Sequence, residues 1–198
     1  MNERNIAKDA LRVMQNQLHR PYFRVDSRIF KSTEKINPQA CYQANLDAKR
    51  LCVERFLEQT NCKCVQRKDC VFVFDDILNA LRFWKKQGMK DNIYQVGINA
   101  DNFIHKGDMN YLDFLLNVLP FSEKEDKENE KIALKYWEDD FCCFSPCYEI
   151  MAKEVVVSEV VLQAGTEYAE KIREDIGSSL DIHLSKSYMD LVNKYYQL

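Results

Sequence analysis

CVFVFDDILNALRFW, residues 70–84, joins a buried strand directly to a helix. Its opening run is entirely apolar, β-branched or aromatic, which is typical of a strand covered on both faces. Asp75 and Asp76 follow, and their carboxylates suit the N-cap and the first turn of a helix. Apolar residues at helical spacing continue to Trp84, and Gly88 is the expected stop. This stretch predicts a protein that combines strands with helices.

Further elements are predicted on both sides of this stretch. Strands are expected at 21–29, 92–98 and 149–162, where the last is either a strand pair or one long bent strand. Helices are expected at 5–18, 41–59, 105–119 after an initial turn, 132–139 and about 167–198. We therefore expect an α+β fold in a single domain over residues 1–198, with an N-terminal helix at 5–18 and a C-terminal helical tail.

Composition supports a core and gives no signal for a membrane. The chain has 198 residues, of which 46% are hydrophobic and 30% charged, so one domain can bury enough apolar surface to fold. No stretch approaches the roughly 20 apolar residues that cross a bilayer, and the first residues are charged, unlike a signal peptide. We expect a cytoplasmic protein, or one delivered into the cytosol of a target cell.

Charge and glycine content argue against two large function classes. The net charge is −3 and the Lys and Arg residues are scattered, so there is no electrostatic footprint for nucleic acid. Only 5 glycines are present, and neither GxGxxG nor GxxxxGK[ST] occurs. Rossmann and P-loop sites are therefore not expected.

Cysteine and histidine spacing predicts no metal site. The cysteines that cluster in sequence are Cys62, Cys64, Cys142, Cys143 and Cys147, and the histidines are His19, His105 and His183. A CxC pair with a CC pair is not the spacing of a zinc site, and no HExxH or HxH pattern occurs. We expect 8 reduced thiols. A Cys–His nucleophile pair stays open, because such partners meet only in the fold.

Three segments follow one another in an informative order. YFRVDSR (22–28) comes first, the strand and helix of 70–84 second, and SPCYEIM (145–151) last, with Glu149 ahead of a valine run. This order resembles the ADP-ribosyltransferase clan, in its cholera- and pertussis-toxin-like branch. That branch opens with an aromatic-Arg-x-Asp-Ser-Arg strand and closes with a glutamate entering a late strand.

The rest of the chain is similar to small uncharacterised bacterial members of this clan over roughly residues 20 to 160. The shared features are an apolar strand, an alanine-containing helix, an IYxV strand, a KxDMN-like turn and a Tyr-Trp pair. Here they are CVFVF, the helix to Trp84, IYQV, HKGDMN and Tyr136-Trp137. The resemblance implies a split mixed β-sheet core with flanking helices.

The resemblance also implies NAD as substrate and transfer of ADP-ribose to a protein or nucleic acid. Breaking the nicotinamide–ribose bond passes through an oxocarbenium-like state, which a carboxylate stabilises, and Glu149 is the candidate. Arg24 is the candidate for binding the diphosphate, since a guanidinium forms a fork that lysine cannot. The implied NAD-binding residues are Arg24, Tyr22, Asp26, Arg28, Phe72 and Phe74.

Two departures from the clan pattern leave alternatives open. The middle motif of this branch normally starts Ser-Thr-Ser, whereas VFVF stands here without a hydroxyl. Arginine-modifying members carry Glu or Gln two residues before the final glutamate, whereas this chain has Cys147. The alternatives are an NAD glycohydrolase and a degenerate member acting as an interaction or antitoxin-like module. An antitoxin or chaperone partner fits the resemblance. A toxin, effector or phage-defence role fits the resemblance.

Overall fold

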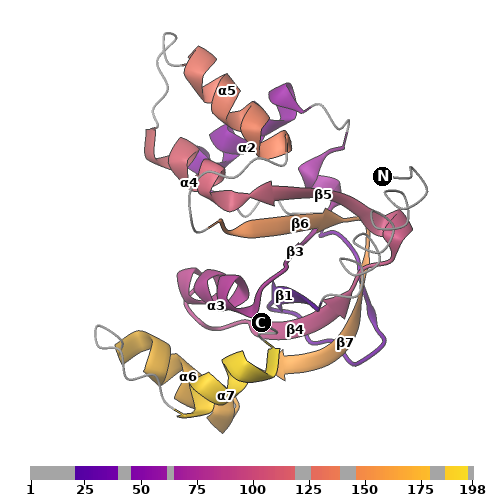
Figure 1. Ribbon diagram of the computed structural model, residues 1–198, viewed down its shortest axis with the longest axis vertical. Helices are drawn as coiled ribbons and strands as arrows, with labels where there is room; N and C mark the ends of the chain where they lie inside the picture. Colours follow the sequence, from indigo (N-terminus) through magenta and orange to yellow (C-terminus); the bar gives the residue numbers. More distant parts are fainter. Residues whose placement is uncertain are drawn as a thin grey trace, which may run out of the picture. The chain divides into compact units, whose positions relative to one another are not determined.

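The protein has an α+β fold, as the sequence predicts (Figure 1). The computed structural model describes residues 21–39, 46–61, 65–118, 126–138, 146–178 and 186–195. These residues form six α-helices, seven strands and two short 3₁₀ helices. The helix expected at 5–18 lies outside the described residues.

The chain divides into two compact units, each built from segments that are far apart in the sequence. The first unit comprises Met1–Lys35, Asp75–Asp101 and Val155–Leu198, and the second comprises Ile36–Phe74 and Asn102–Glu154. The short elements β2 (Lys35–Ile36) and η3 (Ala100–Asn102) each contain residues of both units. The expectation of a single domain over 1–198 stays a prediction.

In the first unit three strands pair antiparallel, and one of them is central. This central strand is β4 (Asn92–Gly97), which pairs with β1 (Tyr22–Asp26) on one edge and with β7 (Val155–Leu162) on the other. The IYQV run lies within β4, and its isoleucine, tyrosine and valine are all buried. Consecutive buried residues point to opposite faces of the strand, so β4 is covered on both faces, which explains its apolar run.

The helices of the first unit are α3 (Ile77–Lys86), α6 (Glu167–Ser178) and α7 (Lys186–Tyr195). Asp76 caps α3, since its Oδ1 accepts a hydrogen bond of 2.7 Å from the backbone N–H of Leu78. The expected carboxylate in the first turn is wrong, because that turn contains no acidic residue. The ring of Phe23 in β1 packs edge-on against Tyr195 of α7, with centroids 5.6 Å apart. Side chains alternate along a strand, so Arg24 lies on the opposite face of β1 from Phe23.

In the second unit β6 (Tyr148–Ala152) is central, between β3 (Val71–Phe74) and β5 (Phe103–Asp108), and both pairs are antiparallel. The prediction of a turn at the start of 105–119 is wrong, because its first residues belong to strand β5. The two readings of 149–162 are resolved in favour of two strands, β6 and β7.

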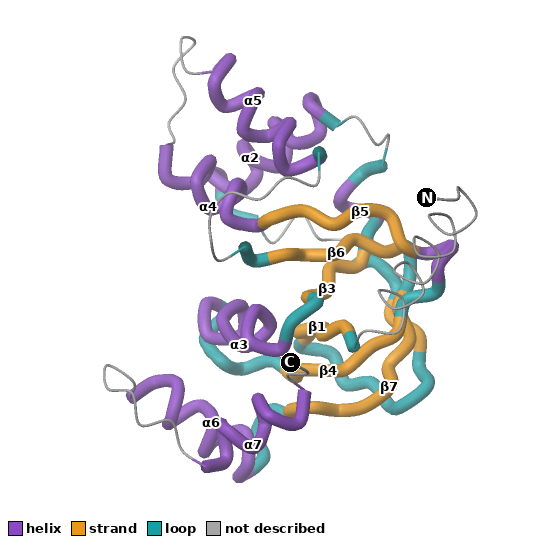
Figure 2. Tube along the Cα trace, in the orientation of Figure 1, coloured by secondary structure: helices purple, strands orange, loops and turns teal. Residues whose placement is uncertain are grey.

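Three helices cover one face of this second group of strands. They are α2 (Ala48–Thr60), α4 (Met109–Val118) and α5 (Asp126–Trp137), and Figure 2 shows them gathered beside β5. The short helix η2 (Arg67–Asp69) leads into β3. The core between helices and strands consists of Val53, Leu57, Cys70, Tyr111, Leu112, Leu115, Ala133, Tyr136, Trp137 and Met151.

In the part of the chain that the structure describes, no helix has both the length and the apolar character that a bilayer crossing requires.

Candidate functional site

Among the described residues, each unit contains a cluster of arginine and carboxylate side chains. The Asp26 cluster, in the first unit, consists of Arg24, Asp26 and Arg28. The Arg67 cluster, in the second unit, consists of Glu54, Arg67, Tyr136 and Glu149. These two clusters contain the two residues that the sequence assigned to catalysis and diphosphate binding.

The Asp26 cluster holds two guanidinium groups on one carboxylate. Oδ2 of Asp26 accepts hydrogen bonds from Arg24 Nε at 3.1 Å, Arg24 Nη2 at 3.0 Å and Arg28 Nη2 at 2.8 Å. Oδ1 accepts from Nε of Arg28 at 2.9 Å and from its backbone N–H at 3.0 Å. The Asp26 side chain is fully buried, whereas those of Arg24 and Arg28 are 17% and 37% exposed. Two cations on one anion give this cluster a net charge of +1.

Strand β4 supports the Asp26 cluster from the neighbouring position. In the β1–β4 register Asn92 lies opposite Asp26 and Tyr94 lies opposite Arg24. Asn92 Nδ2 donates to the carbonyl oxygens of Asp26 at 3.3 Å and Arg28 at 3.1 Å. The Tyr94 hydroxyl donates to the Arg28 carbonyl at 2.9 Å. The bend after β1, which carries Arg28, is therefore fixed by β4.

Electrostatics keep Asp26 ionised. Burial raises the pKa of its carboxyl, but the hydrogen bonds from Arg28 and the charge of Arg24 outweigh burial and hold that pKa below its usual value. Tyr22, which the sequence assigned to NAD binding, shares the face of Arg24 and is only 5% exposed. In this structure Tyr22 is part of the core of the first unit.

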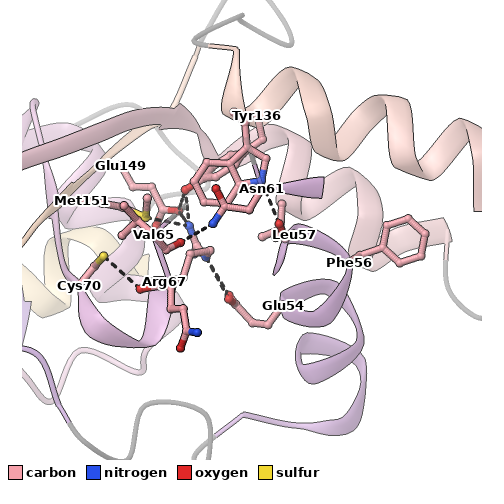
Figure 3. Close-up of polar contacts among 12 residues, drawn as sticks. Glu54, Phe56, Leu57, Asn61, Val65, Arg67, Cys70, Tyr136, Glu149 and Met151 are labelled. Atoms are coloured by element: carbon pink, nitrogen blue, oxygen red, sulfur yellow. Dashed lines mark hydrogen bonds and ion pairs between the residues drawn. The ribbon is translucent and has the colours of Figure 1, made fainter. Parts of the chain in front are cut away.

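The Arg67 cluster has the opposite stoichiometry, one guanidinium between two carboxylates (Figure 3). Arg67 Nε donates to Glu54 Oε2 at 3.0 Å and Oε1 at 3.2 Å. Arg67 Nη1 donates to the Tyr136 hydroxyl and, at 2.6 Å, to Glu149 Oε1. The Tyr136 hydroxyl donates to the same Glu149 Oε1, also at 2.6 Å.

All four members of the Arg67 cluster are buried. The side chains of Glu54, Arg67 and Glu149 are 7%, 2% and 6% exposed, and Tyr136 is fully buried. Two carboxylates and one guanidinium give a net charge of −1. Buried charges of this kind need partners with good geometry, and here each carboxylate has Arg67. A net negative, desolvated site favours a developing positive charge.

Local structure explains how these side chains meet. Glu54 lies on the buried face of α2 with Val53 and Leu57, so its carboxylate points into the core. Arg67 stands in η2 immediately before β3, and its Cζ lies 4.6 Å from the ring centroid of Phe72. A guanidinium over an aromatic face gains a cation–π interaction.

The strand register places Glu149 on the face that the helices cover. Phe74 of β3 and Gly107 of β5 both lie opposite Glu149. Gly107 leaves space that the Tyr136 ring fills, since a Cβ added at Gly107 would lie 2.4 Å from Cε2 of that ring. Tyr136 thus crosses β5 at Gly107 to reach Glu149.

Burial also sets the ionisation of the groups beside Arg67. Burial raises the pKa of Tyr136 well above its ordinary value, although the charge of Arg67 opposes this, so its hydroxyl keeps its proton. Burial raises the pKa of Cys70 to about 11, again against the opposing charge of Arg67. Cys70 is therefore a buried, protonated thiol.

The predicted site residues fall into two groups. Tyr22, Arg24, Asp26 and Arg28 lie in the first unit, and Phe72, Phe74 and Glu149 lie in the second. Within the second unit, Phe74 is beside Glu149 and Phe72 is beside Arg67.

Sequence reasoning missed Glu54 and Arg67, and gave no role to Tyr136. One signal was present, because Glu54 is three residues before Leu57 and therefore on the apolar face of its helix. A carboxylate on an apolar face indicates a buried partner. No comparable signal marks Arg67 or Tyr136.

Cysteine and histidine residues give no metal centre within the described ranges. There, no three His, Cys, Asp or Glu side chains are arranged to hold a metal ion. Among the described residues, Cys52, Cys70 and Cys147 form no disulfide, whereas Cys62, Cys64, Cys142, Cys143, His19 and His183 lie outside the described residues. His105 is a core residue, whose Nε2 lies 2.9 Å from the Tyr136 carbonyl oxygen.

No protein-family model matches this chain, and no curated protein matches it.

Proposed function

We propose that this protein binds NAD and transfers its ADP-ribose group to a macromolecular acceptor. The observation that carries the proposal is the Glu149 carboxylate, fixed at Oε1 by Arg67 and Tyr136 within a buried cluster of net charge −1. Glu149 is the residue at which the sequence resembles the catalytic glutamate of ADP-ribosyltransferases. The split-sheet fold of that clan is part of the proposal, and the two antiparallel three-stranded groups support it.

The proposed chemistry needs a carboxylate and little else. The bond between ribose C1′ and the nicotinamide nitrogen breaks, and its electron pair leaves with nicotinamide. The ribose becomes an oxocarbenium-like cation, which Glu149 stabilises before an acceptor nucleophile bonds to C1′ and loses its proton to solvent. Among the described residues, Glu149 Oε2 accepts no hydrogen bond, which leaves this oxygen for the ribose.

The resemblance assigns the diphosphate to Arg24, and within the first unit the Asp26 cluster has the chemistry of an anion site. Its net charge of +1 comes from two guanidinium groups, the side chains best suited to fork-like contacts with phosphate oxygens. Asp26 orients both arginines, so a diphosphate meets donors whose rotamer entropy is already lost. Arg24 and Arg28 are the proposed phosphate ligands.

A second candidate, NAD glycohydrolysis, is favoured by Cys147. This residue occupies the position where arginine-modifying members carry Glu or Gln, and its backbone N–H donates to Asp108 Oδ1 at 3.0 Å. A thiol is neither of these side chains, so an arginine acceptor is not supported, whereas water as acceptor does not require either of them.

Labelled NAD distinguishes these functions. The protein is incubated with NAD labelled in the adenylate part and with cell lysate, and both free nicotinamide and label on macromolecules are measured. Transfer predicts both products, whereas glycohydrolysis predicts nicotinamide and free ADP-ribose. If neither product forms with any lysate fraction, the interaction-module alternative is the one that fits.

Two variants link the activity to the site. Glu149→Gln is expected to lower turnover on the order of 10²-fold with little change in NAD affinity, because the lost charge acts in the transition state. Glu159→Gln is the matched control, since Glu159 also contacts a cation and a tyrosine, Lys194 and Tyr195. Arg24→Ala is expected to weaken NAD binding measured by calorimetry, whereas Arg50→Ala is not. A fully active Glu149→Gln protein ends the catalytic assignment.

A further inference from the structure

We infer that Tyr136 is a positioning residue for Glu149, and that Gly107 provides the space which lets it act. This inference rests on the proposed function, because it concerns how the Glu149 carboxylate is oriented toward the ribose. The Tyr136 hydroxyl, near the end of helix α5, fixes the plane of the Glu149 carboxylate.

Hydrogen bonds from two donors orient the Glu149 carboxylate. The Tyr136 hydroxyl and Arg67 Nη1 both donate to Oε1, each at 2.6 Å. Two donors on one oxygen fix the orientation of the carboxyl group and direct the other oxygen, Oε2, away from both. A carboxylate held in this way loses little rotational freedom when substrate binds.

Strand β3, which pairs with the strand of Glu149, has no hydroxyl side chain opposite Glu149. In the β3–β6 register Phe74 lies opposite Glu149 and Phe72 lies opposite Met151. Both aromatic side chains lack a hydrogen-bond donor for a carboxylate. The hydroxyl that contacts Glu149 comes instead from Tyr136, near the end of α5.

The Tyr136 ring occupies the space that Gly107 leaves over strand β5. Gly107 is paired with Glu149, and an added Cβ there would meet Cε2, Cζ and Cδ2 of Tyr136 at 2.4, 2.7 and 2.8 Å. Real Cβ atoms do not approach ring carbons so closely, so any side chain at Gly107 must displace the ring. The position of the hydroxyl therefore depends on this glycine.

Contacts with His105 and Trp137 hold the Tyr136 ring independently of Glu149. Its ring is edge-on to His105 and Trp137, with centroids 5.3 and 5.1 Å apart, and it is fully buried. The Tyr136 carbonyl oxygen lies 2.9 Å from His105 Nε2. The hydroxyl is thus preorganised by packing, which is the requirement for a positioning group.

The kinetic test is Tyr136→Phe, which removes the hydroxyl and keeps the ring. We expect kcat for nicotinamide release to fall on the order of 10-fold with KM for NAD unchanged, because orientation is needed most in the transition state. Rates are normalised to the folded fraction. Tyr195→Phe is the control, since it removes a hydroxyl that contacts Glu159 outside the site, and its kcat is expected to match wild type.

Gly107→Ala is the second variant. This variant keeps the tyrosine at 136 but displaces its ring, and with it the hydroxyl, from Glu149. We therefore expect kcat to fall as in Tyr136→Phe. Combined with Tyr136→Phe it is expected to lower kcat no further, because both changes remove the same contact. Independent, multiplicative losses of kcat contradict the inference.

A stability cycle keeps the inference testable apart from catalysis. Denaturation midpoints are compared for wild type, Tyr136→Phe, Glu149→Gln and the double variant, and the effects are expected to be non-additive. Additive effects show that the contact is absent and overturn the inference. Non-additive effects with an unchanged kcat in Tyr136→Phe show a structural contact only and also overturn it. A wild-type protein that releases no nicotinamide overturns the proposed function, and the role of Tyr136 in it, while the cycle still reports the contact.

Discussion

The Asp26 cluster and the Arg67 cluster use the same chemistry in inverse proportions. One carboxylate holds two guanidinium groups in the first, and one guanidinium holds two carboxylates in the second. The arginines of the first are 17% and 37% exposed, whereas Arg67 is 2% exposed. In the first cluster the shared group is the buried anion, and in the second it is the buried cation.

This difference separates two uses of charge. Partly exposed guanidinium groups on a buried carboxylate remain within reach of solvent and suit an anionic ligand. A guanidinium buried between two carboxylates contributes mainly by preventing their mutual repulsion. We therefore expect loss of the shared group to lower the free energy of unfolding in both clusters. The larger loss is expected in the Arg67 cluster, because its carboxylates are buried too.

The largest expected effect is that of Arg67→Met. Methionine keeps much of the volume but leaves Glu54 and Glu149 buried without the guanidinium, which is expected to cost about 3–5 kcal/mol in the free energy of unfolding. Urea denaturation measures this cost. Arg50→Met is the control, since the pair of Arg50 with Asp47 is exposed and worth about 0.5 kcal/mol. Equal effects of the two variants would remove the distinction between the clusters.

A smaller loss is expected for Asp26→Asn. The amide keeps the shape of the side chain but leaves two arginines without their anion, and these remain in contact with water. We expect a cost of about 1.5–3 kcal/mol, the range for hydrogen bonds to charged groups. A loss as large as that of Arg67→Met would contradict the proposed effect of exposure.

The same variant makes a prediction about pH. The folded protein holds the pKa of Asp26 below its ordinary value of 3.8, so the unfolded chain binds this proton more readily. The stabilisation is therefore fully present above the unfolded pKa and is lost as pH falls through the folded pKa. The difference in stability between wild type and Asp26→Asn is expected to shrink below about pH 4. A difference independent of pH would exclude an ionised Asp26.

Tyr94→Phe tests the support of the Asp26 cluster. It removes the hydrogen bond to the Arg28 carbonyl and is expected to cost about 1 kcal/mol, measured by denaturation. Because this bond fixes the bend that carries Arg28, NAD affinity is expected to fall with it. Tyr168→Phe, which removes a hydroxyl contact on the exposed surface of α6, is expected to change neither quantity.

The smallest effect concerns Cys70, beside the Arg67 cluster. Its pKa of about 11 predicts slow alkylation by iodoacetamide at pH 8 in the folded protein, whereas the exposed Cys52 reacts readily. Peptide mass spectrometry after timed alkylation measures both rates. Rapid reaction of Cys70 would show that Arg67, and not burial, dominates its environment.

The sequence by itself determined those features that depend on neighbours in the chain. The apolar run before Asp75 predicts β3, and the Asp76 side chain predicts the start of α3. The Asp26 cluster is also local, because each arginine is two residues from Asp26 on an extended or bent segment. Residues at alternate positions of a strand share a face, so the motif places Arg24 beside Asp26. The bend that brings Arg28 to Asp26 is held by strand β4 as well.

Only the tertiary structure decided the Arg67 cluster. Arg67 is separated from Glu54, Tyr136 and Glu149 by 13, 69 and 82 positions, and three different elements deliver these partners. Gly107 shows the same limit, because glycine and aspartate predict a turn locally, whereas strand β5 continues through both. The requirement for glycine there comes from the Tyr136 ring, which reaches it across the fold. Such contacts depend on packing between distant segments, and no local pattern of residues encodes their distances.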